Sequence, residues 1–144
     1  MRRIILILAA CALALTFVPI KTLNSPDWKV SVVDQNGQPV SGITVRLSYQ
    51  NYSAEDKTHE IDGTTDQYGH VAFKSQAVSA SGASRILYTL QSALGGVHAS
   101  FGPHASVFAF GKGLEGFDVD SQDLIAEWTG KSEQMQSRIV VHPR

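Results

Sequence analysis

The chain has 144 residues, a length that suits a single domain. Its residues are 43% hydrophobic and 17% charged, which is apolar enough for a buried core and excludes a disordered chain. The formal net charge is −1, so no excess of basic residues indicates a nucleic-acid partner.

The first segment is an apolar run preceded by two basic residues. Arg2 and Arg3 stand before residues 4–20, and this order is typical of an export signal. Ala12-Leu13-Ala14 offers a cleavage site of small residues. The run of about 17 residues is also the lower limit for a membrane span, so an uncleaved anchor is the alternative. In both cases the arginines stay inside and the rest of the chain faces outward.

Cys11 is the single cysteine and lies inside this first segment. Residues 8–11, Leu-Ala-Ala-Cys, resemble a bacterial lipobox, so lipidation of the cysteine is a third alternative. The remaining chain has no cysteine and folds without a disulfide. We therefore expect an export signal or membrane anchor over residues 1–23, a polar linker over 24–27 and a β-domain over 28–144.

Alternation of apolar and polar residues predicts β-strands along most of this domain. The clearest pattern covers residues 43–50, and the polar segment 57–65 reads as a weak edge strand. Residues 106–110 are apolar enough to be buried on both faces. The predicted strands cover residues 28–33, 43–50, 57–65, 71–73, 97–101, 106–110, 124–130 and 137–142.

One helix interrupts the strands. Leu87, Leu90 and Leu94 recur at helical spacing, so we expect a helix over 84–95 that begins at Ser84 and ends at Gly95. The Gly- and Asp-rich residues 111–123 read as a loop. About seven to eight strands and one short helix predict an all-β fold, an antiparallel Greek-key or transthyretin-like β-sandwich.

One predicted turn sequence, Asp-Gln-x-Gly, occurs twice in the chain. Asp34 and Gly37 frame Asp-Gln-Asn-Gly, and Asp66 and Gly69 frame Asp-Gln-Tyr-Gly. An aspartate at the first turn position accepts hydrogen bonds from backbone N–H groups two residues on. A glycine at the fourth position takes positive φ at little cost. We therefore expect two tight hairpin turns with a structural role at one end of the sandwich, and too few acids cluster at either turn for calcium.

These two turns and their flanking strands resemble the carboxypeptidase regulatory-like domain, a transthyretin-like sandwich. The resemblance covers residues 28–74 and leaves the second half of the chain unmatched. It implies a folding, docking or sugar-binding module, mostly without catalysis, and it names no ligand. The matching residues are Val32, Asp34, Gly37, Pro39, Val40, Gly42, Ile43, Val45, Leu47, Thr65, Asp66, Gly69, Val71 and Phe73.

Four residues are the candidates for ligand contact. Tyr52 lies in a predicted loop and Tyr68 at a turn tip, whereas Trp28 and Tyr49 fall on inward phases of their strands. His98 and His104 flank a Gly-Pro turn and can approach each other across a hairpin. With an acid they could hold zinc, but scattered surface histidines are far commoner, so we predict no metal site. The ligand-binding candidates are Tyr52, Tyr68, His98 and His104.

Sequence motifs for catalysis are weak. Residues 111–116 satisfy G-x-G-x-x-G, but no helical pattern follows them, so a loop is expected. Asp118, Asp120 and Asp123 are too sparse for a calcium loop. The chain lacks the C-terminal Tyr-Arg-Gly-Ser of hydroxyisourate hydrolases, and its tyrosines and histidines do not follow the iron-binding motif of intradiol dioxygenases. We predict no catalytic residue and no cofactor.

The expected function is a non-catalytic, exported binding or interaction module of the bacterial periplasm or cell surface. Its partner would be an unidentified protein or carbohydrate of the cell envelope, not a nucleic acid. One alternative is a structural envelope protein anchored in the membrane by its N-terminal segment. The other is a metal-dependent enzyme built on a transthyretin-like fold.

Overall fold

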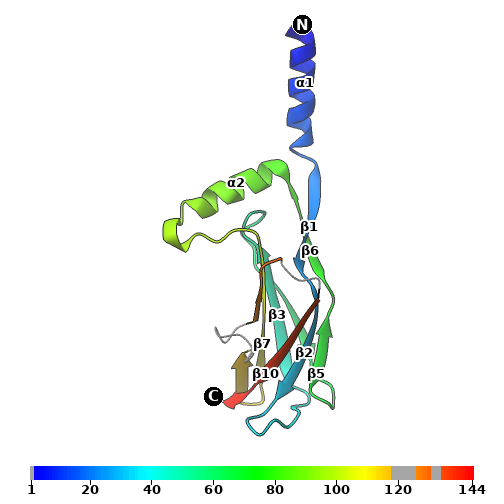
Figure 1. Ribbon diagram of the computed structural model, residues 1–144, viewed down its shortest axis with the longest axis vertical. Helices are drawn as coiled ribbons and strands as arrows, with labels where there is room; N and C mark the ends of the chain where they lie inside the picture. The colour runs from blue at the N-terminus through cyan, green and yellow to red at the C-terminus, as the bar shows by residue number, and fades with distance from the viewer. Residues whose placement is uncertain (1, 118–125, 131–133) are drawn as a thin grey trace.

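The computed structural model describes residues 2–117, 126–130 and 134–144. A β-sandwich forms the body, α1 projects from one end of it, and α2 lies crosswise to α1 at that end (Figure 1). The helices are α1 (Arg2–Leu15), α2 (Gly82–Ala93) and the 3-10 helix η1 (Gly96–His98). The strands are β1 (Pro19–Ser25), β2 (Asp27–Val33), β3 (Thr44–Asn51), β4 (His59–Thr64), β5 (His70–Phe73), β6 (Gln76–Ser81), β7 (Pro103–Gly111), β8 (Leu114–Phe117), β9 (Ala126–Trp128), β10 (Gln134–Val140) and β11 (His142–Pro143).

The strands form three sheets. One has the order β10-β2-β5, the largest has the order β11-β8-β7-β3-β4 with β9 paired to β7, and β1 pairs with β6. The predicted all-β sandwich is therefore confirmed, and β4 is the edge strand that its polar sequence indicated. One pair departs from the antiparallel expectation, because β10 runs parallel to β2 over the whole length of both strands.

The core lies between the sheet of β2 and the sheet of β3. Trp28 and Ile139 face inward from the first sheet, and Leu47 and Val107 face inward from the second. All four side chains are fully buried. The indole Nε1 of Trp28 donates a hydrogen bond to Ser137 Oγ at 2.9 Å, so β2 and β10 are joined by a side-chain bond as well as by their ladder.

The segment expected as a linker is part of the fold. β1 pairs with β6 from Pro19 to Ser25, and β2 begins two residues later, so residues 24–27 do not form a free linker. Asn24 is fully buried and its Oδ1 accepts a hydrogen bond from Asn51 Nδ2 at 3.0 Å. The polar sequence did not indicate a strand, because the bond that accommodates the buried Asn24 Oδ1 comes from a residue distant in the chain, and Asn24 Nδ2 is buried without a partner among the described residues.

Two further expectations about strands are wrong. Residues 97–101 begin in η1 and continue without regular structure, and Val97 is 96% exposed. Their alternation therefore reflects no sheet. Residues 114–117 of the predicted loop form β8, which pairs with β7, whereas residues 118–123 lie outside the described residues.

The strand expected to be buried on both faces is buried on one. Val107 and Ala109 of β7 point into the core, but Phe108 and Phe110 lie on the outer face and are partly exposed. Their rings stack with centroids 5.6 Å apart, and the Arg46 guanidinium lies 5.1 Å from the Phe110 centroid. Aromatic and cation–π contacts therefore cover apolar area that a second sheet would otherwise bury.

The predicted helix is confirmed, with a shifted start. The Ser81 hydroxyl accepts a hydrogen bond from the Ser84 amide at 3.1 Å, so Ser81 is the N-cap and α2 begins at Gly82. The described part of the chain holds no helix with the length and hydropathy that a membrane crossing requires.

The two Asp-Gln-x-Gly segments adopt the same local structure. Asp34 Oδ1 accepts from the Asn36 and Gln38 amides, both at 2.8 Å. Asp66 Oδ1 accepts from the amides of Tyr68 and His70 at 2.8 and 2.9 Å. The final glycines have φ of +78° and +75°. The bond from His70, followed by that from Tyr68, lowers the pKa of Asp66, because each favours the charged carboxylate.

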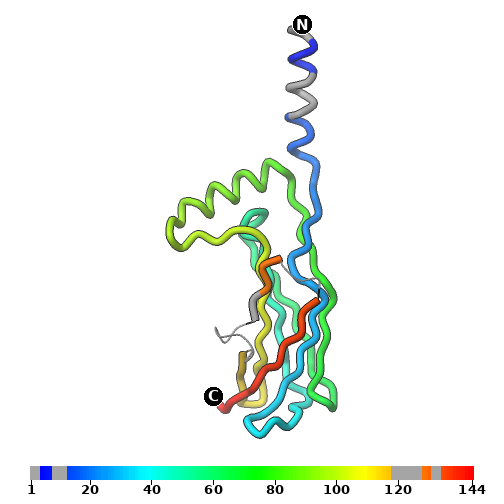
Figure 2. The backbone as a smooth tube through the Cα atoms, viewed as in Figure 1, coloured from blue at the N-terminus to red at the C-terminus, as the bar shows by residue number. Residues whose placement is uncertain are grey.

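These turns do not close hairpins, contrary to expectation. The first joins β2 to β3 and the second joins β4 to β5, so each carries the chain from one sheet to the other. Both lie at the end of the sandwich remote from α1 (Figure 2). Backbone bonds connect them, with Val32 N donating to Gly69 O at 2.8 Å and Val40 N donating to Val32 O at 3.0 Å. The same turn structure therefore carries the chain between the two sheets at both positions.

Candidate binding site

Two of the four predicted contact residues meet directly. Tyr52 follows the end of β3, and its amide donates to Gly102 O at 3.0 Å. His104 stands near the start of β7, opposite Gln50 in the register of β3 and β7. The rings of Tyr52 and His104 touch edge to face, with centroids 5.2 Å apart. Two segments about fifty residues apart in sequence therefore present one aromatic surface.

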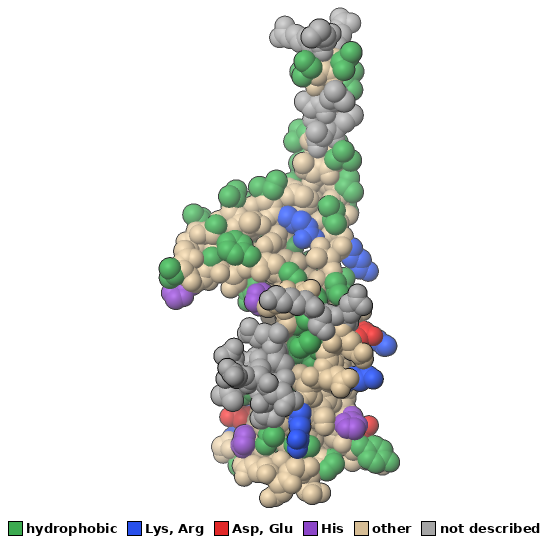
Figure 3. Space-filling view, in the orientation of Figure 1, with side chains coloured by type: hydrophobic (Ala, Val, Ile, Leu, Met, Phe, Trp, Pro, Cys, Tyr) green, Lys and Arg blue, Asp and Glu red, His purple; other side chains and the backbone are tan. Residues whose placement is uncertain are grey.

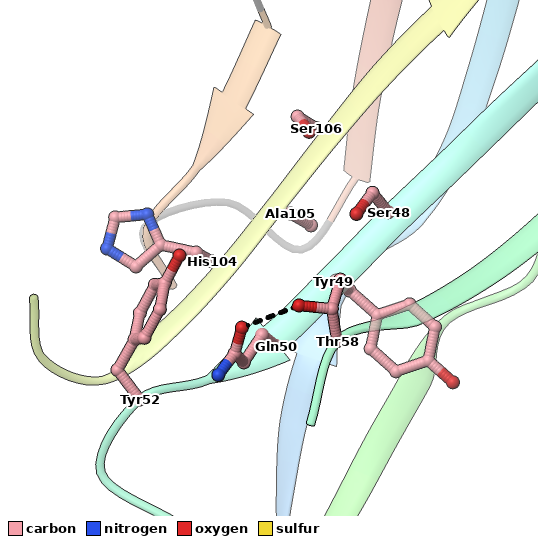
Figure 4. A pocket seen from close by; sticks show the side chains of 8 residues that line it. All are labelled: Ser48, Tyr49, Gln50, Tyr52, Thr58, His104, Ala105 and Ser106. Atoms are coloured by element: carbon pink, nitrogen blue, oxygen red, sulfur yellow. Dashed lines mark hydrogen bonds between the residues drawn. The ribbon is translucent and has the colours of Figure 1, made fainter. Parts of the chain in front are cut away.

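A small open hollow of about 100 Å³ lies beside this ring pair (Figure 4). Thr58 Oγ1 donates to Gln50 Oε1 at 2.8 Å across it, and Tyr49 points its ring away from the hollow. Its wall is mostly polar and includes Ser48, Gln50, Tyr52, Thr58, His104 and Ser106. An aromatic face next to hydroxyl and amide groups suits a polar ligand with an apolar side.

A second hollow of about 320 Å³ opens on the other side of Tyr52, beneath α2. Gln50 and Tyr52 line both hollows, so the two adjoin. The Ser92 hydroxyl donates to Tyr52 O at 3.0 Å and holds α2 over this space. Residues of α2, the loop after β3 and η1 line it, among them Glu55, Asp56, Tyr88, Gln91 and His98.

The structure thus gathers three predicted residues and leaves one apart. Tyr52, His98 and His104 line adjoining hollows, although His98 and His104 do not pair across a hairpin as expected, because residues 97–101 form no strand. Tyr68 is 63% exposed in the turn before β5, at the opposite end of the sandwich. A site that combines all four residues is not present.

Sequence reasoning missed the residues around Glu55. His59 Nε2 lies 2.8 Å from Glu55 Oε2, and the His59 ring stacks on Tyr49 with centroids 5.0 Å apart. Burial first, and the nearby Glu55 carboxylate second, raise the pKa of Tyr49. Glu55 precedes the predicted edge strand over residues 57–65 and His59 belongs to it, and no sequence pattern indicated that the two side chains meet.

The comparisons with known proteins yield a fold but no family. No family model and no curated protein sequence matches the chain. Among solved structures, it is similar to 3-chlorocatechol 1,2-dioxygenase from Rhodococcus opacus 1CP, with a TM-score of 0.51 and 14% sequence identity. The match covers 86% of this chain and 62% of the dioxygenase chain, so the protein spans less than two thirds of that enzyme. At this identity the likeness shows a shared β-sandwich and carries no activity.

The residues present do not fit the iron site that intradiol dioxygenases build from two tyrosines and two histidines. Two Tyr–His pairs exist here, but His59 is opposite Tyr49 and His104 is opposite Gln50 in the registers of β3. Neighbouring residues of a strand point to opposite faces, so the two pairs lie on different faces of one sheet. Within residues 2–117, 126–130 and 134–144, no three His, Cys, Asp or Glu side chains gather as metal ligands.

Proposed function

We propose that the protein is a non-catalytic, exported binding module of the periplasm or cell surface, with the adjoining hollows around Tyr52 as its contact site. The observation that carries the proposal is the convergence of Tyr52, His98 and His104 from three separate elements. A stacking ring surrounded by hydrogen-bonding side chains matches an envelope carbohydrate or a polar peptide segment. The resemblance of residues 28–74 to carboxypeptidase regulatory-like domains supports the same class of function.

The side chains around His104 favour binding over catalysis. Ser48 and Ser106 share its hollow, but in the described part of the chain no hydrogen bond joins either serine to His104. The His104 ring instead contacts Tyr52. We therefore assign His104 to ligand contact beside Tyr52.

Binding at the hollows should respond to their aromatic residues and not to the distant tyrosine. With isotope-labelled protein, soluble peptidoglycan fragments or envelope polysaccharide should first shift the NMR signals around Tyr52, His98 and His104. Tyr52→Ala and His104→Ala should each weaken binding by about 1–2 kcal/mol, or five- to thirtyfold, because each loses a stacking surface.

Tyr68→Ala is the matched control, since it removes the same side-chain type from the opposite end of the sandwich. It should leave affinity unchanged. The binding proposal fails if Tyr68→Ala weakens binding as much as Tyr52→Ala, or if the added glycan is cleaved.

A second candidate function is a membrane-anchored envelope protein, and α1 favours it. Ile4, Ile5, Leu6 and Ile7 are all 62% exposed, and Leu15 at the other end of the helix is 69% exposed. Apolar side chains near both ends of the helix are therefore open to their surroundings, as expected for insertion in lipid. α1 also remains attached to the fold, since the Ala83 amide donates to Thr16 O at 2.9 Å.

Retention of the N-terminal segment distinguishes this candidate from a cleaved signal. Because β1 pairs with β6 from Pro19 onward, a cut that spares the fold must fall earlier, as Ala12-Leu13-Ala14 would allow. An anchored protein should sediment with membranes and retain α1 on N-terminal sequencing. A soluble chain beginning after Ala14 would contradict anchoring and leave the binding module intact.

A further inference from the structure

α2 is amphipathic, but its apolar face points away from the protein core. No residue of α2 is buried. Its apolar residues Ile86, Leu87, Leu90 and Leu94, with Val97 of η1, are between 60% and 96% exposed. Soluble monomers rarely leave so continuous an apolar surface in water, so this surface indicates a contact with another apolar phase. We call these five residues the apolar ridge.

Polar contacts on the other side of α2 hold the ridge outward. Arg85 Nη2 donates to Ile20 O at 2.9 Å and to Thr22 Oγ1, both in β1. Ser92 donates to Tyr52 O, and Tyr88 and Gln91 line the hollow between α2 and the sandwich. The polar side of α2 therefore packs on the body of the protein, and the ridge cannot rotate inward without breaking these bonds.

The ridge and α1 face the same surroundings. α1 ends at Leu15, and the next residue, Thr16, accepts the hydrogen bond from Ala83 in the first turn of α2. Figure 3 shows hydrophobic side chains along the edge of α2 that faces the same way as the free end of α1. A flat apolar phase that received α1 end-on would therefore meet α2 along its side.

Charge distribution at this end matches an anionic bilayer. All 13 acidic residues lie outside residues 2–25 and 76–98, the segments that build α1, β1, β6, α2 and η1. On the outer side these segments carry Lys21 and Arg85, whereas Arg2 and Arg3 stand at the start of α1, toward the opposite face of the bilayer. Glu55 and Asp56 line the hollow beneath α2, on the side away from the ridge. Anionic headgroups attract basic groups and repel acids at this range.

We propose that the apolar ridge docks on the outer surface of a lipid bilayer, with α2 lying in the interface beside the inserted α1. This inference rests on the anchored form of the protein. α1 has 14 residues and spans ~21 Å at 1.5 Å per residue, less than the ~30 Å of a hydrocarbon core. A helix lying in the interface sinks its apolar face ~5–10 Å below the headgroups and adds a second apolar contact to this short anchor. Docking would also fix the orientation of the hollows around Tyr52 relative to the membrane.

The test places an environment-sensitive nitrobenzoxadiazole dye on the ridge of the full chain. The labelled variant is Leu90→Cys with Cys11→Ala, and the matched control is Tyr68→Cys with Cys11→Ala. Each is reconstituted into vesicles of phosphatidylcholine with phosphatidylglycerol. At position 90 the dye should brighten several-fold, shift to the blue and be quenched by lipids spin-labelled near the headgroup. At position 68 the dye should keep its emission in water.

Adding Leu87→Gln and Leu94→Gln should remove most of the brightening at position 90 while the chain still floats with the vesicles. If the chain floats with the vesicles but the dye at position 90 emits as in water, ridge docking is overturned, whereas membrane anchoring by α1 is supported. Absence of flotation would overturn the anchor and the ridge proposal together. Brightening without lipid that grows with protein concentration would assign the ridge to a second copy of the chain and overturn the bilayer as its occupant.

Discussion

Gly69→Ala should destabilise the fold by about 3–5 kcal/mol, far more than the same change in the matching turn. Gly69 has φ of +75°, and a Cβ built there would lie 2.5 Å from the carbonyl oxygen of Val32. That oxygen accepts the hydrogen bond from Val40 that ties the first turn to β2. The added methyl group therefore combines left-handed strain with the displacement of the backbone bond that holds the first turn against β2.

Gly37→Ala is the internal control, because Gly37 has nearly the same φ of +78°. A Cβ at position 37 meets only the flexible end of Arg138, at 3.7 Å, so this change should cost about 1–2 kcal/mol from left-handed strain alone. Urea denaturation of the two variants provides the comparison. If both variants lost the same free energy of unfolding, the close approach of Gly69 to the Val32 carbonyl oxygen would not contribute to stability.

Trp28→Ala should cost about 3–5 kcal/mol, the usual effect of removing a fully buried tryptophan. Trp28 lies in the central strand of its sheet, opposite Phe73 on β5 and Met135 on β10. Its side chain is fully buried between the two sheets. The change leaves a cavity that the surrounding β-structure cannot close, because both neighbouring strands are held by their ladders. The midpoint of thermal or denaturant unfolding measures the loss.

Ser137→Ala separates packing from hydrogen bonding at this position. It leaves the indole in place but removes the acceptor of the Trp28 Nε1–H bond, so a buried donor loses its partner. We expect a loss of about 1–3 kcal/mol, smaller than that of Trp28→Ala. If Trp28→Ala were as mild as Ser137→Ala, the indole would not be a main packing element of the core.

Prediction from sequence worked where the physics is local. Each turn needs only an aspartate, a glycine and its own backbone. Its hydrogen bonds and positive φ were therefore predictable from the four residues 34–37 or 66–69. Residues 43–50 alternate cleanly because one face of β3 meets the core and the other meets solvent. The helix at residues 82–93 was predictable for the same reason, since its leucines repeat with the helical period.

Prediction failed where the partner is distant in sequence. The sequence of β1 resembles a linker because its buried Asn24 bonds to the distant Asn51, and its ladder partner β6 has only small or polar residues besides Val78. The Tyr52–His104 contact depends on the register between β3 and β7, which no local pattern encodes. The apolar repeat of α2 predicted a helix but not the direction of its face.

By itself, the sequence determined an all-β body, one amphipathic helix, an apolar N-terminal segment and two matching turns. Each follows from periodicity or turn chemistry within a few residues. Only the tertiary structure decided that the turns cross between sheets, that β10 runs parallel to β2, and that Tyr52, His98 and His104 share adjoining hollows. It also decided that the leucines of α2 face outward, because polar side chains on the other side of the helix bond to β1 and to the loop after β3.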